Sequence, residues 1–217
     1  MAKQAKTGPE IAPEIVPEIA LDQLCRTAHW CAARGWVPAT SGNFSIRDPA
    51  GRILISPSGL DKGQMEPSGL LTLDPSGHLL AGSARPSAET ALHVVIYRDR
   101  PEANAILHVH TVWNTLIGSR FVAAGQFRLS GYELLKALEG VTTHEHRETV
   151  PVLANMQDYG LLSTQLAQCL AANPAAHGVL LSGHGLYTWG RTVAEARRHL
   201  EALEFLFEVE GRRIFGV

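Results

Sequence analysis

The sequence is poor in the features that mark disulfide-rich, nucleic-acid-binding or membrane proteins. It has three cysteines, Cys25, Cys31 and Cys169, an odd number without Cys-x-x-Cys spacing, which argues against a disulfide framework. With 19 basic and 21 acidic residues, the net charge of -2 offers no basic surface for nucleic acid or anionic lipid. No apolar run approaches the roughly 20 residues of a membrane-spanning helix, and the first ten residues contain no apolar signal segment. We therefore expect a cytoplasmic protein with free thiols and no nucleic-acid or membrane partner.

The composition suits one globular domain preceded by a short leader. The 217 residues are 45% hydrophobic and 18% charged, which is typical of a chain that buries a core. The tripeptide Pro-Glu-Ile occurs three times within residues 8–20, and its prolines are incompatible with a regular helix. We expect residues 1–20 to form an extended, flexible leader and residues 21–217 to form the functional domain.

Local patterns predict strands and helices mixed along the whole domain. Two Asp-Pro-x-Gly turns, each between alternating segments, predict β-hairpins over 44–55 and 71–80. Buried strands are predicted at 105–110, 178–181 and 186–189. Helices are predicted at 21–35, after Pro86-Ser87, at 132–138 and 158–172, and after the capping box Thr192-x-x-Glu195. This mixture indicates a single α/β domain.

The sharpest chemical feature is the tripeptide His108-Val109-His110 on a buried strand. Residues i and i+2 of a strand point to the same face, so the two imidazoles lie side by side. Such a buried pair needs either hydrogen-bond partners or a metal ion. From the tripeptide alone, a metal site and a pair of hydrogen-bonded core histidines carry equal weight.

His184 is the third candidate ligand. It stands in Ser182-Gly183-His184-Gly185 between two apolar strands, and its glycine neighbours allow a sharp turn. A lone histidine in a turn is usually exposed to solvent. Because apolar strands flank this turn, we expect the His184 ring at the mouth of a cleft instead. Three histidines with one position open are typical of a catalytic zinc-type site, although iron, cobalt and nickel also accept imidazole.

The other histidines have simpler interpretations. His144 and His146 lie among charged residues, and we expect them in a solvated loop that precedes Pro151. His93 follows Glu89 by four residues on a predicted helix, which suggests a local Glu–His contact. No partner is evident for the remaining four, His29, His78, His177 and His199.

Small polar residues at turns suggest a site for an anion. They occur in Ser41-Gly42-Asn43, in Ser58-Gly59 and in Pro86-Ser87-Ala88. The last segment opens a helix, whose free N–H groups favour a phosphate, although Ser87 alone could be a helix cap. Together with a metal, these segments suggest a phosphorylated small molecule.

Two carboxylates are candidates for acid/base chemistry. Glu89 lies in the predicted first turn of the helix after Ser87, near the anion and metal residues, or else simply complements the helix dipole. Glu133 stands in an apolar stretch, where it either faces a site or belongs to a solvated helix face. The residues alone favour neither carboxylate.

The ordered set of these motifs resembles the class II aldolase family over residues 21–215. The resemblance implies a three-layer α/β/α domain with a central, largely antiparallel sheet, usually assembled as a homotetramer. It implies one zinc ion per subunit, held by His108, His110 and His184, that stabilises an enediolate. The phosphate of a sugar-phosphate substrate would be bound by Asn43, Ser58, Gly59 and Ser87.

Within the family, four stretches resemble the branch that dehydrates a methylthio-substituted ketopentose phosphate in methionine salvage. They are residues 87–93, 131–144, 155–158 and 183–190. Glu133 matches the acid/base proposed for that branch, and Glu89 matches the acid/base carboxylate of the aldolases. Because some dehydratases carry cysteine at the Glu89 position, the division of labour between the two carboxylates stays open.

The implied reaction is loss of water across C3–C4, which begins with removal of the C3 proton next to the C2 carbonyl. A divalent ion with three neutral imidazole ligands keeps its charge and polarises that carbonyl, while Glu133 carries the proton to the departing hydroxyl. An aldolase or 4-epimerase acting on fuculose, rhamnulose or ribulose phosphate would share the metal and phosphate motifs. A non-catalytic adducin-like binding module, which lacks the metal, is disfavoured by the histidines and both glutamates.

Overall fold

Helix α1 (Glu18–Ala33) is the first element of the computed structural model, which describes residues 18–217. Within the described residues the helix already includes Glu18, three residues before the predicted start at Leu21. The other residues of the predicted leader, 1–17, lie outside the described residues.

The strands form one sheet in the order β4-β3-β2-β1-β5-β9-β8-β7-β6. Neighbouring strands are antiparallel except β7 and β8, which are parallel, so the predicted largely antiparallel sheet is confirmed. Both predicted hairpins are present, as β1–β2 and β3–β4. The bounds are β1 (Asn43–Arg47), β2 (Ile53–Ile55), β3 (Leu71–Leu73), β4 (Leu79–Ala81), β5 (Ala105–Val109), β6 (Gln126–Ser130), β7 (Arg147–Leu153), β8 (Gly178–Leu181) and β9 (Gly185–Gly190).

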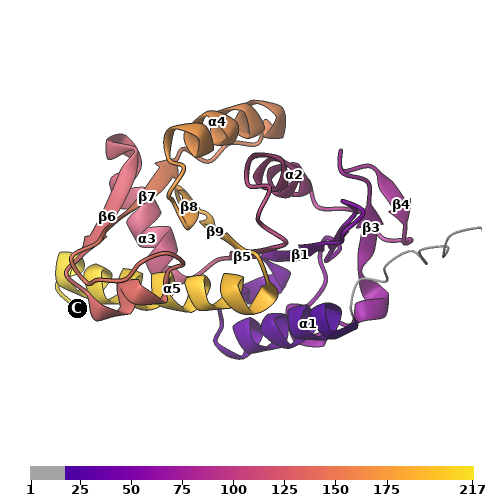
Figure 1. Ribbon diagram of the computed structural model, residues 1–217, viewed down its shortest axis with the longest axis horizontal. Coiled ribbons are helices and arrows are strands. Elements are labelled where there is room, and N and C mark those ends of the chain that lie inside the picture. Colours follow the sequence, from indigo (N-terminus) through magenta and orange to yellow (C-terminus); the bar gives the residue numbers. More distant parts are fainter. Residues whose placement is uncertain (1–17) are drawn as a thin grey trace, which may run out of the picture.

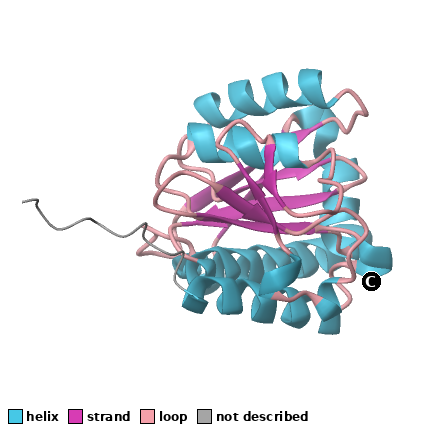
Figure 2. Ribbon diagram, turned by 90° about the vertical axis from the view of Figure 1, so that its right-hand side faces the viewer, coloured by secondary structure: helices cyan, strands magenta, loops and turns pink. Residues whose placement is uncertain are grey.

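Helices cover both faces of this sheet, which gives the predicted three layers (Figure 2). Helices α2 (Thr90–Asp99) and α4 (Tyr159–Ala172) lie on one face, and α1 and α5 (Val193–Phe215) lie on the other (Figure 1). Each face has its own apolar core, because side chains of successive strand residues point to opposite sides. Five 3-10 segments complete the described elements: η1 (Pro38–Thr40), η2 (Lys62–Gln64), η3 (Pro67–Gly69), η4 (Val122–Ala124) and η5 (Glu133–Ala137).

The sequence analysis did not predict one helix and two strands. Helix α3 (Val112–Phe121) exposes 69% of Val112 and buries Asn114 completely, the reverse of an amphipathic pattern. Strands β6 and β7 form an antiparallel pair with Gln126 opposite Pro151. The predicted loop before Pro151 is therefore wrong from Arg147 onward, where β7 begins.

The described residues carry three free thiols, as expected. Cys25 and Cys31 are buried and Cys169 is half-buried, and none of the three forms a disulfide. Burial raises the pKa of Cys25 to about 11, which keeps this thiol protonated and unreactive. No helix within residues 18–217 is both long enough and apolar enough to cross a membrane.

Three neighbouring strands bring the candidate site residues together. In the register of β1, β5 and β9, His108 lies opposite Asn43 on one side and opposite Tyr187 on the other. The turn between β8 and β9 carries His184, and the segment that leads into α2 carries Glu89. The central pairings of the sheet therefore place four distant segments at one end of these strands.

Candidate active site

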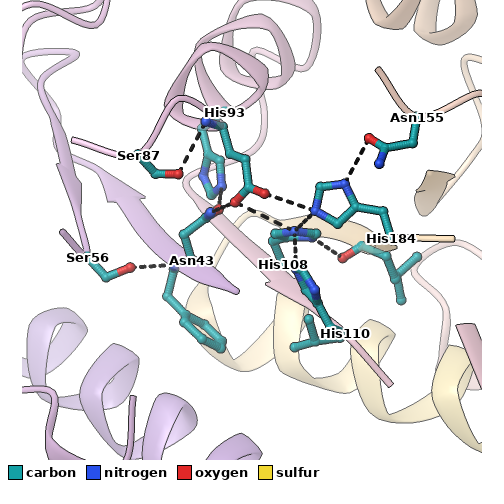
Figure 3. Close-up of polar contacts among 12 residues, drawn as sticks. Asn43, Ser56, Ser87, His93, His108, His110, Asn155 and His184 are labelled. Carbon is teal, nitrogen blue, oxygen red and sulfur yellow. Dashed lines mark hydrogen bonds and ion pairs between the residues drawn. The ribbon is translucent and has the colours of Figure 1, made fainter. Parts of the chain in front are cut away.

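The three predicted histidine ligands converge (Figure 3). Glu89 belongs to the same group of potential metal ligands. The Nε2 atom of His108 lies 2.8 Å from that of His110 and 3.3 Å from that of His184. Oε1 of Glu89 lies 2.9 Å from Nε2 of His184. One potential ligand atom from each of the four side chains lies within 4.8 Å of the others.

The hydrogen-bond partners of two of these rings show that the cluster suits a cation. Nδ1 of His108 lies 3.0 Å from the carbonyl oxygen of Leu186, so Nδ1 carries the proton and Nε2 is a bare acceptor. Nδ1 of His184 contacts Oδ1 of Asn155 at 3.1 Å, so this Nδ1 also carries the proton and Nε2 of His184 is also a bare acceptor. This Nε2 faces a carboxylate oxygen, and two acceptors are stable at that distance only with a cation or proton between them. The donor set therefore fits a divalent metal.

The charges at the cluster favour the same interpretation. Burial, together with the charge of the neighbouring His110, lowers the pKa of His108 well below its usual value. Burial also lowers the pKa of His110 to about 4. Although burial opposes ionisation of Glu89, its contact with His184 and the charge that the nearby histidines carry when protonated lower its pKa to about 2. At neutral pH His108 and His110 are uncharged and Glu89 is a carboxylate, the protonation states that bind metals.

A chain of buried side chains holds Glu89 in place. Nδ2 of Asn43 donates to Oε2 of Glu89, and Oδ1 of Asn43 accepts from Nε2 of His93. Nδ1 of His93 contacts Oγ of Ser45 at 2.7 Å. Burial lowers the pKa of His93 to about 3, which keeps its ring neutral. The expected direct contact between His93 and Glu89 is therefore wrong, because Asn43 lies between them.

Two glycines allow the backbone to close around the cluster. Gly42, at φ +72°, lies so near β5 that a Cβ would come 2.5 Å from the carbonyl oxygen of His108. A Cβ at Gly185 would lie 2.3 Å from the carbonyl oxygen of Val109 and 3.0 Å from the ring of His108. No larger residue fits at either position without moving the strand that carries the histidines.

A cavity of about 330 Å³ opens beside the metal ligands. Its lining includes all four residues that were predicted to bind phosphate, together with Glu89 and His110. The lining residues are Ala39, Thr40, Ser41, Gly42, Asn43, Pro57, Ser58, Gly59, Ser87, Glu89 and His110. Ser87 does not cap α2 in the way considered from the sequence, because Glu89 occupies the N-cap position and Oγ of Ser87 accepts from the Glu89 N–H.

Glu133, the other predicted acid/base residue, lies apart from this cluster. Its side chain is 71% exposed, and its carboxylate contacts Lys136 at 2.5 Å and His144 at 3.2 Å. Neither the group of four metal-ligand candidates nor the cavity lining includes it. Within one chain, the structure brings Glu89 but not Glu133 to the histidines.

A second histidine cluster surrounds buried Glu148 near the other end of β9. Oε2 of Glu148 contacts Nε2 of His146 at 2.9 Å, and Oε1 contacts Nδ1 of His177 at 3.1 Å. The prediction of a solvated loop is therefore confirmed for exposed His144 but wrong for His146, which is half-buried. His177 also contacts the carbonyl oxygen of Glu139 at 2.9 Å, so both of its nitrogens face acceptors, an arrangement that favours the imidazolium form.

Three residues that support the site were not recognised as site residues from the sequence. Asn155 orients His184, and Tyr187 stacks on His108 with ring centroids 3.8 Å apart. Lys62 is buried beside the cavity loop, where its Nζ donates to the carbonyl oxygen of Thr40. Asn155 and Tyr187 both lie in stretches that carry the family resemblance, whereas Lys62 lies outside them.

The fold and this cluster define a class of protein that sequence comparison also identifies. The chain belongs to the family described as class II aldolase and adducin N-terminal domain, which it matches over residues 22–210. The L-fuculose-1-phosphate aldolase of Thermus thermophilus has the same fold, with a TM-score of 0.72 at 24% identity. The match covers 91% of this chain and 96% of that one.

Curated relatives of higher identity point to one branch of the family. The methylthioribulose-1-phosphate dehydratase of Enterobacter sp. (strain 638) is 47% identical over 194 residues, covering 89% of this chain and 95% of the relative. The enzyme of the same name from Methylococcus capsulatus is 48% identical over 190 residues, covering 88% and 92%. The resemblance expected from the sequence motifs is confirmed.

Proposed function

We propose that the chain is a lyase that removes water from 5-methylthioribulose 1-phosphate to give 2,3-diketo-5-methylthiopentyl 1-phosphate in methionine salvage. The main supporting observation is that Glu89 and three histidines converge beside a cavity, which Glu89 and His110 line together with the predicted phosphate residues. Relatives with the dehydratase name, 47% and 48% identical over nearly the whole chain, support the choice of substrate and reaction. The three free thiols suit the reducing cytoplasm.

The metal in this proposal is one zinc ion per subunit, bound by His108, His110 and His184. When bound, a divalent ion supplies Lewis-acid polarisation of the substrate carbonyl. The protein fixes the direction of the ligand atoms, since Leu186 and Asn155 occupy the Nδ1 atoms of His108 and His184. Such contacts behind the ligands orient the rings before the metal arrives.

The cavity residues hold the far end of the substrate in this proposal. Ser58, Gly59 and Ser87, with a second N–H of Asn43, bind the phosphate, so that binding energy remote from C3 orients the reacting carbon. The Glu89 carboxylate, held by Asn43, is ionised and stands at the metal ligands. It is placed to accept a proton from the substrate carbon next to the carbonyl.

In this proposal Glu133 serves as the second acid/base at the site of another copy of the chain. Its exposure, and its contacts with Lys136 and His144 rather than with the three candidate ligand histidines, support this assignment. Val112, two residues after His110, is 69% exposed, which leaves apolar surface beside the metal ligands for a second copy to cover. We propose a homotetramer in which a neighbouring subunit brings Glu133 to the Glu89 carboxylate and the bound substrate.

Mass spectrometry of the zinc-loaded protein with methylthioribulose 1-phosphate tests the proposed reaction. We expect a product lighter by one water, and no product after treatment with a chelator. Two carbonyl fragments would instead make the protein an aldolase of the same family. An unchanged substrate would rule out the proposed dehydration, and fuculose, rhamnulose and ribulose phosphates would then be tested.

A further inference from the structure

The cavity wall contains a strained turn that needs an explanation. Ala39 and Thr40 adopt left-handed backbone conformations, with φ of +51° and +64°. This region is unfavourable for residues other than glycine, and especially for β-branched threonine. Both residues line the cavity and lead directly into Ser41-Gly42-Asn43. Such strain persists only where surrounding contacts hold it.

Lys62 supplies the contact that holds this turn. Its side chain is 1% exposed, and its Nζ donates to the carbonyl oxygen of Thr40 at 2.9 Å and to that of Leu60 at 2.8 Å. Leu60 directly follows Ser58-Gly59 on another part of the cavity wall. One ammonium group therefore ties together the two loops that form the cavity.

The positive charge of Lys62 is not neutralised by an ion pair within the described residues. No carboxylate lies within 4.0 Å of its Nζ, and the charges that influence it from farther away are Glu89 and Asp61. Burial lowers the pKa of Lys62 to about 8, so the ammonium form still predominates at neutral pH. A buried, unpaired cation is costly, and that cost falls when an anion binds nearby.

Ser41 adds an independent sign of a missing ligand. Its Oγ atom is buried and has no hydrogen-bond partner among residues 18–217, although the residue lines the cavity beside the strained turn. A buried hydroxyl without a partner is rare in proteins. An anion in the cavity would provide the missing acceptor.

We propose that Lys62 makes this cavity selective for a phosphorylated substrate, by holding the Ala39–Ser41 turn and by placing a positive charge behind it. The inference rests on the proposed function and deepens it, since it names the residue that separates the sugar phosphate from the free sugar. Lys62 is a positioning residue, because its contacts are with the backbone of the cavity wall and not with the reacting atoms.

Replacing Lys62 with methionine tests the proposal, because methionine keeps much of the side-chain volume and removes the charge. We expect the Lys62→Met variant to bind inorganic phosphate about 10- to 100-fold more weakly by calorimetry, the range for a hydrogen bond to a charged group. KM for the phosphorylated substrate should rise by a similar factor, while kcat and zinc content stay within about threefold. Arg26→Met, which removes an exposed positive charge on α1, should change none of these values.

Further variants keep the test decisive. Lys62→Arg should retain part of the phosphate affinity because it keeps the charge, and circular dichroism with thermal melting checks that each variant folds. Adding Thr40→Gly to Lys62→Met relieves the strain, and the double variant should still bind phosphate weakly because the charge is missing. Equal phosphate affinity of Lys62→Met and the wild type would overturn the proposal.

The failure of the proposed function can be distinguished from the failure of this inference. If the zinc-loaded wild type does not dehydrate methylthioribulose 1-phosphate but binds inorganic phosphate in a Lys62-dependent way, only the substrate assignment fails. If dehydration occurs and Lys62→Met weakens binding of unphosphorylated methylthioribulose as strongly as that of its phosphate, the selectivity role of Lys62 is wrong.

Discussion

At the scale of single residues, His108, His184 and Glu89 each have one side-chain atom held by a neighbour and another directed at the cluster. The Leu186 carbonyl oxygen accepts from Nδ1–H of His108, Oδ1 of Asn155 accepts from Nδ1–H of His184, and Asn43 donates to Glu89. Occupying one atom fixes the tautomer or rotamer and leaves the second atom free as an acceptor. The resulting group of acceptors is unfavourable without a cation, which is the physical basis for assigning a metal centre.

Glu89 should matter more for turnover than for metal binding. Its replacement by glutamine keeps the shape but removes the negative charge and the ability to accept a proton. We expect Glu89→Gln to lower kcat by about 10²–10⁴-fold, the usual contribution of a general acid/base, while three imidazoles still retain the metal. Steady-state kinetics with metal analysis of the same sample checks this. Near-normal turnover with full metal content would remove Glu89 from the mechanism.

At the scale of elements, the packing of β5 against the start of β9 shapes the candidate metal centre. The two strands approach closely only because residue 185 is glycine. The sequence analysis identified this glycine as a source of turn flexibility, whereas its larger role is to leave space for the histidine rings and the β5 backbone.

The close approach predicts that Gly185→Ala damages the metal site. The added Cβ would lie 2.3 Å from the Val109 carbonyl oxygen, so β5 or the β8–β9 turn must move. We expect a loss of stability of about 1–3 kcal/mol and about 10- to 100-fold weaker metal binding. Urea denaturation and metal competition measure the two effects. Gly69→Ala is the matched control, because no atom lies within 4 Å of its added Cβ, and it should alter neither value.

The Glu148–His177 pair joins β7 to the start of β8 and predicts a dependence of stability on pH. Although burial opposes the charge on each group, their mutual hydrogen bond and attraction raise the pKa of His177 above 6.5 and lower that of Glu148 below 4.5. The contribution of His177 to the free energy of unfolding is therefore complete below pH 6.5 and is lost as the pH rises through its raised pKa. The contribution of Glu148 to the same free energy is complete above pH 4.5 and is lost as the pH falls through its lowered pKa.

Comparison of the wild type with His177→Gln tests this dependence. The wild type should be more stable by about 1–3 kcal/mol near pH 5.5, the range for a hydrogen bond between charged groups. The difference should shrink at higher pH as His177 loses its proton. Urea denaturation of both proteins from pH 5 to pH 9 measures it, and a constant difference would contradict the charged pair.

At the scale of the whole molecule, one chain separates the two carboxylates that the sequence analysis assigned to the same reaction. Glu89 lies at the histidines, whereas Glu133 lies on an exposed segment against Lys136 and His144. If both carboxylates act on one substrate molecule, the complete site contains residues of two chains.

Mixed oligomers provide a test of this shared site. Glu89→Gln and Glu133→Gln should each be inactive alone, while their co-expressed mixture regains activity because some sites combine an intact Glu89 with a neighbour's intact Glu133. With random assembly, about a quarter of the sites should be active. Absence of recovery in mixtures shown to contain hybrid oligomers would place Glu133 outside the active site.

Local sequence patterns were sufficient for most of the elements. Turn motifs, caps and alternation predicted both Asp-Pro-x-Gly hairpins, β5 and the helices α1, α4 and α5, because each pattern reports interactions between residues near in sequence. They failed for α3, whose exposed Val112 and buried Asn114 reverse the amphipathic pattern, and for β7, where Glu148 and Pro151 interrupt the apolar alternation. In both cases long-range contacts outweighed local preference.

The sequence by itself determined the chemistry available to this protein: a histidine pair on one face of a strand, small polar turns, and a third histidine between glycines. Only the tertiary structure decided which groups meet. His108 and His184 are 76 positions apart, and the pairing of β5 with β9 brings them within 3.3 Å. The tertiary structure likewise placed Glu89, Asn155 and Lys62 at the site and left Glu133 outside it. The physical reason is that strand neighbours are selected by burial and hydrogen bonding across the whole chain, which no short segment encodes.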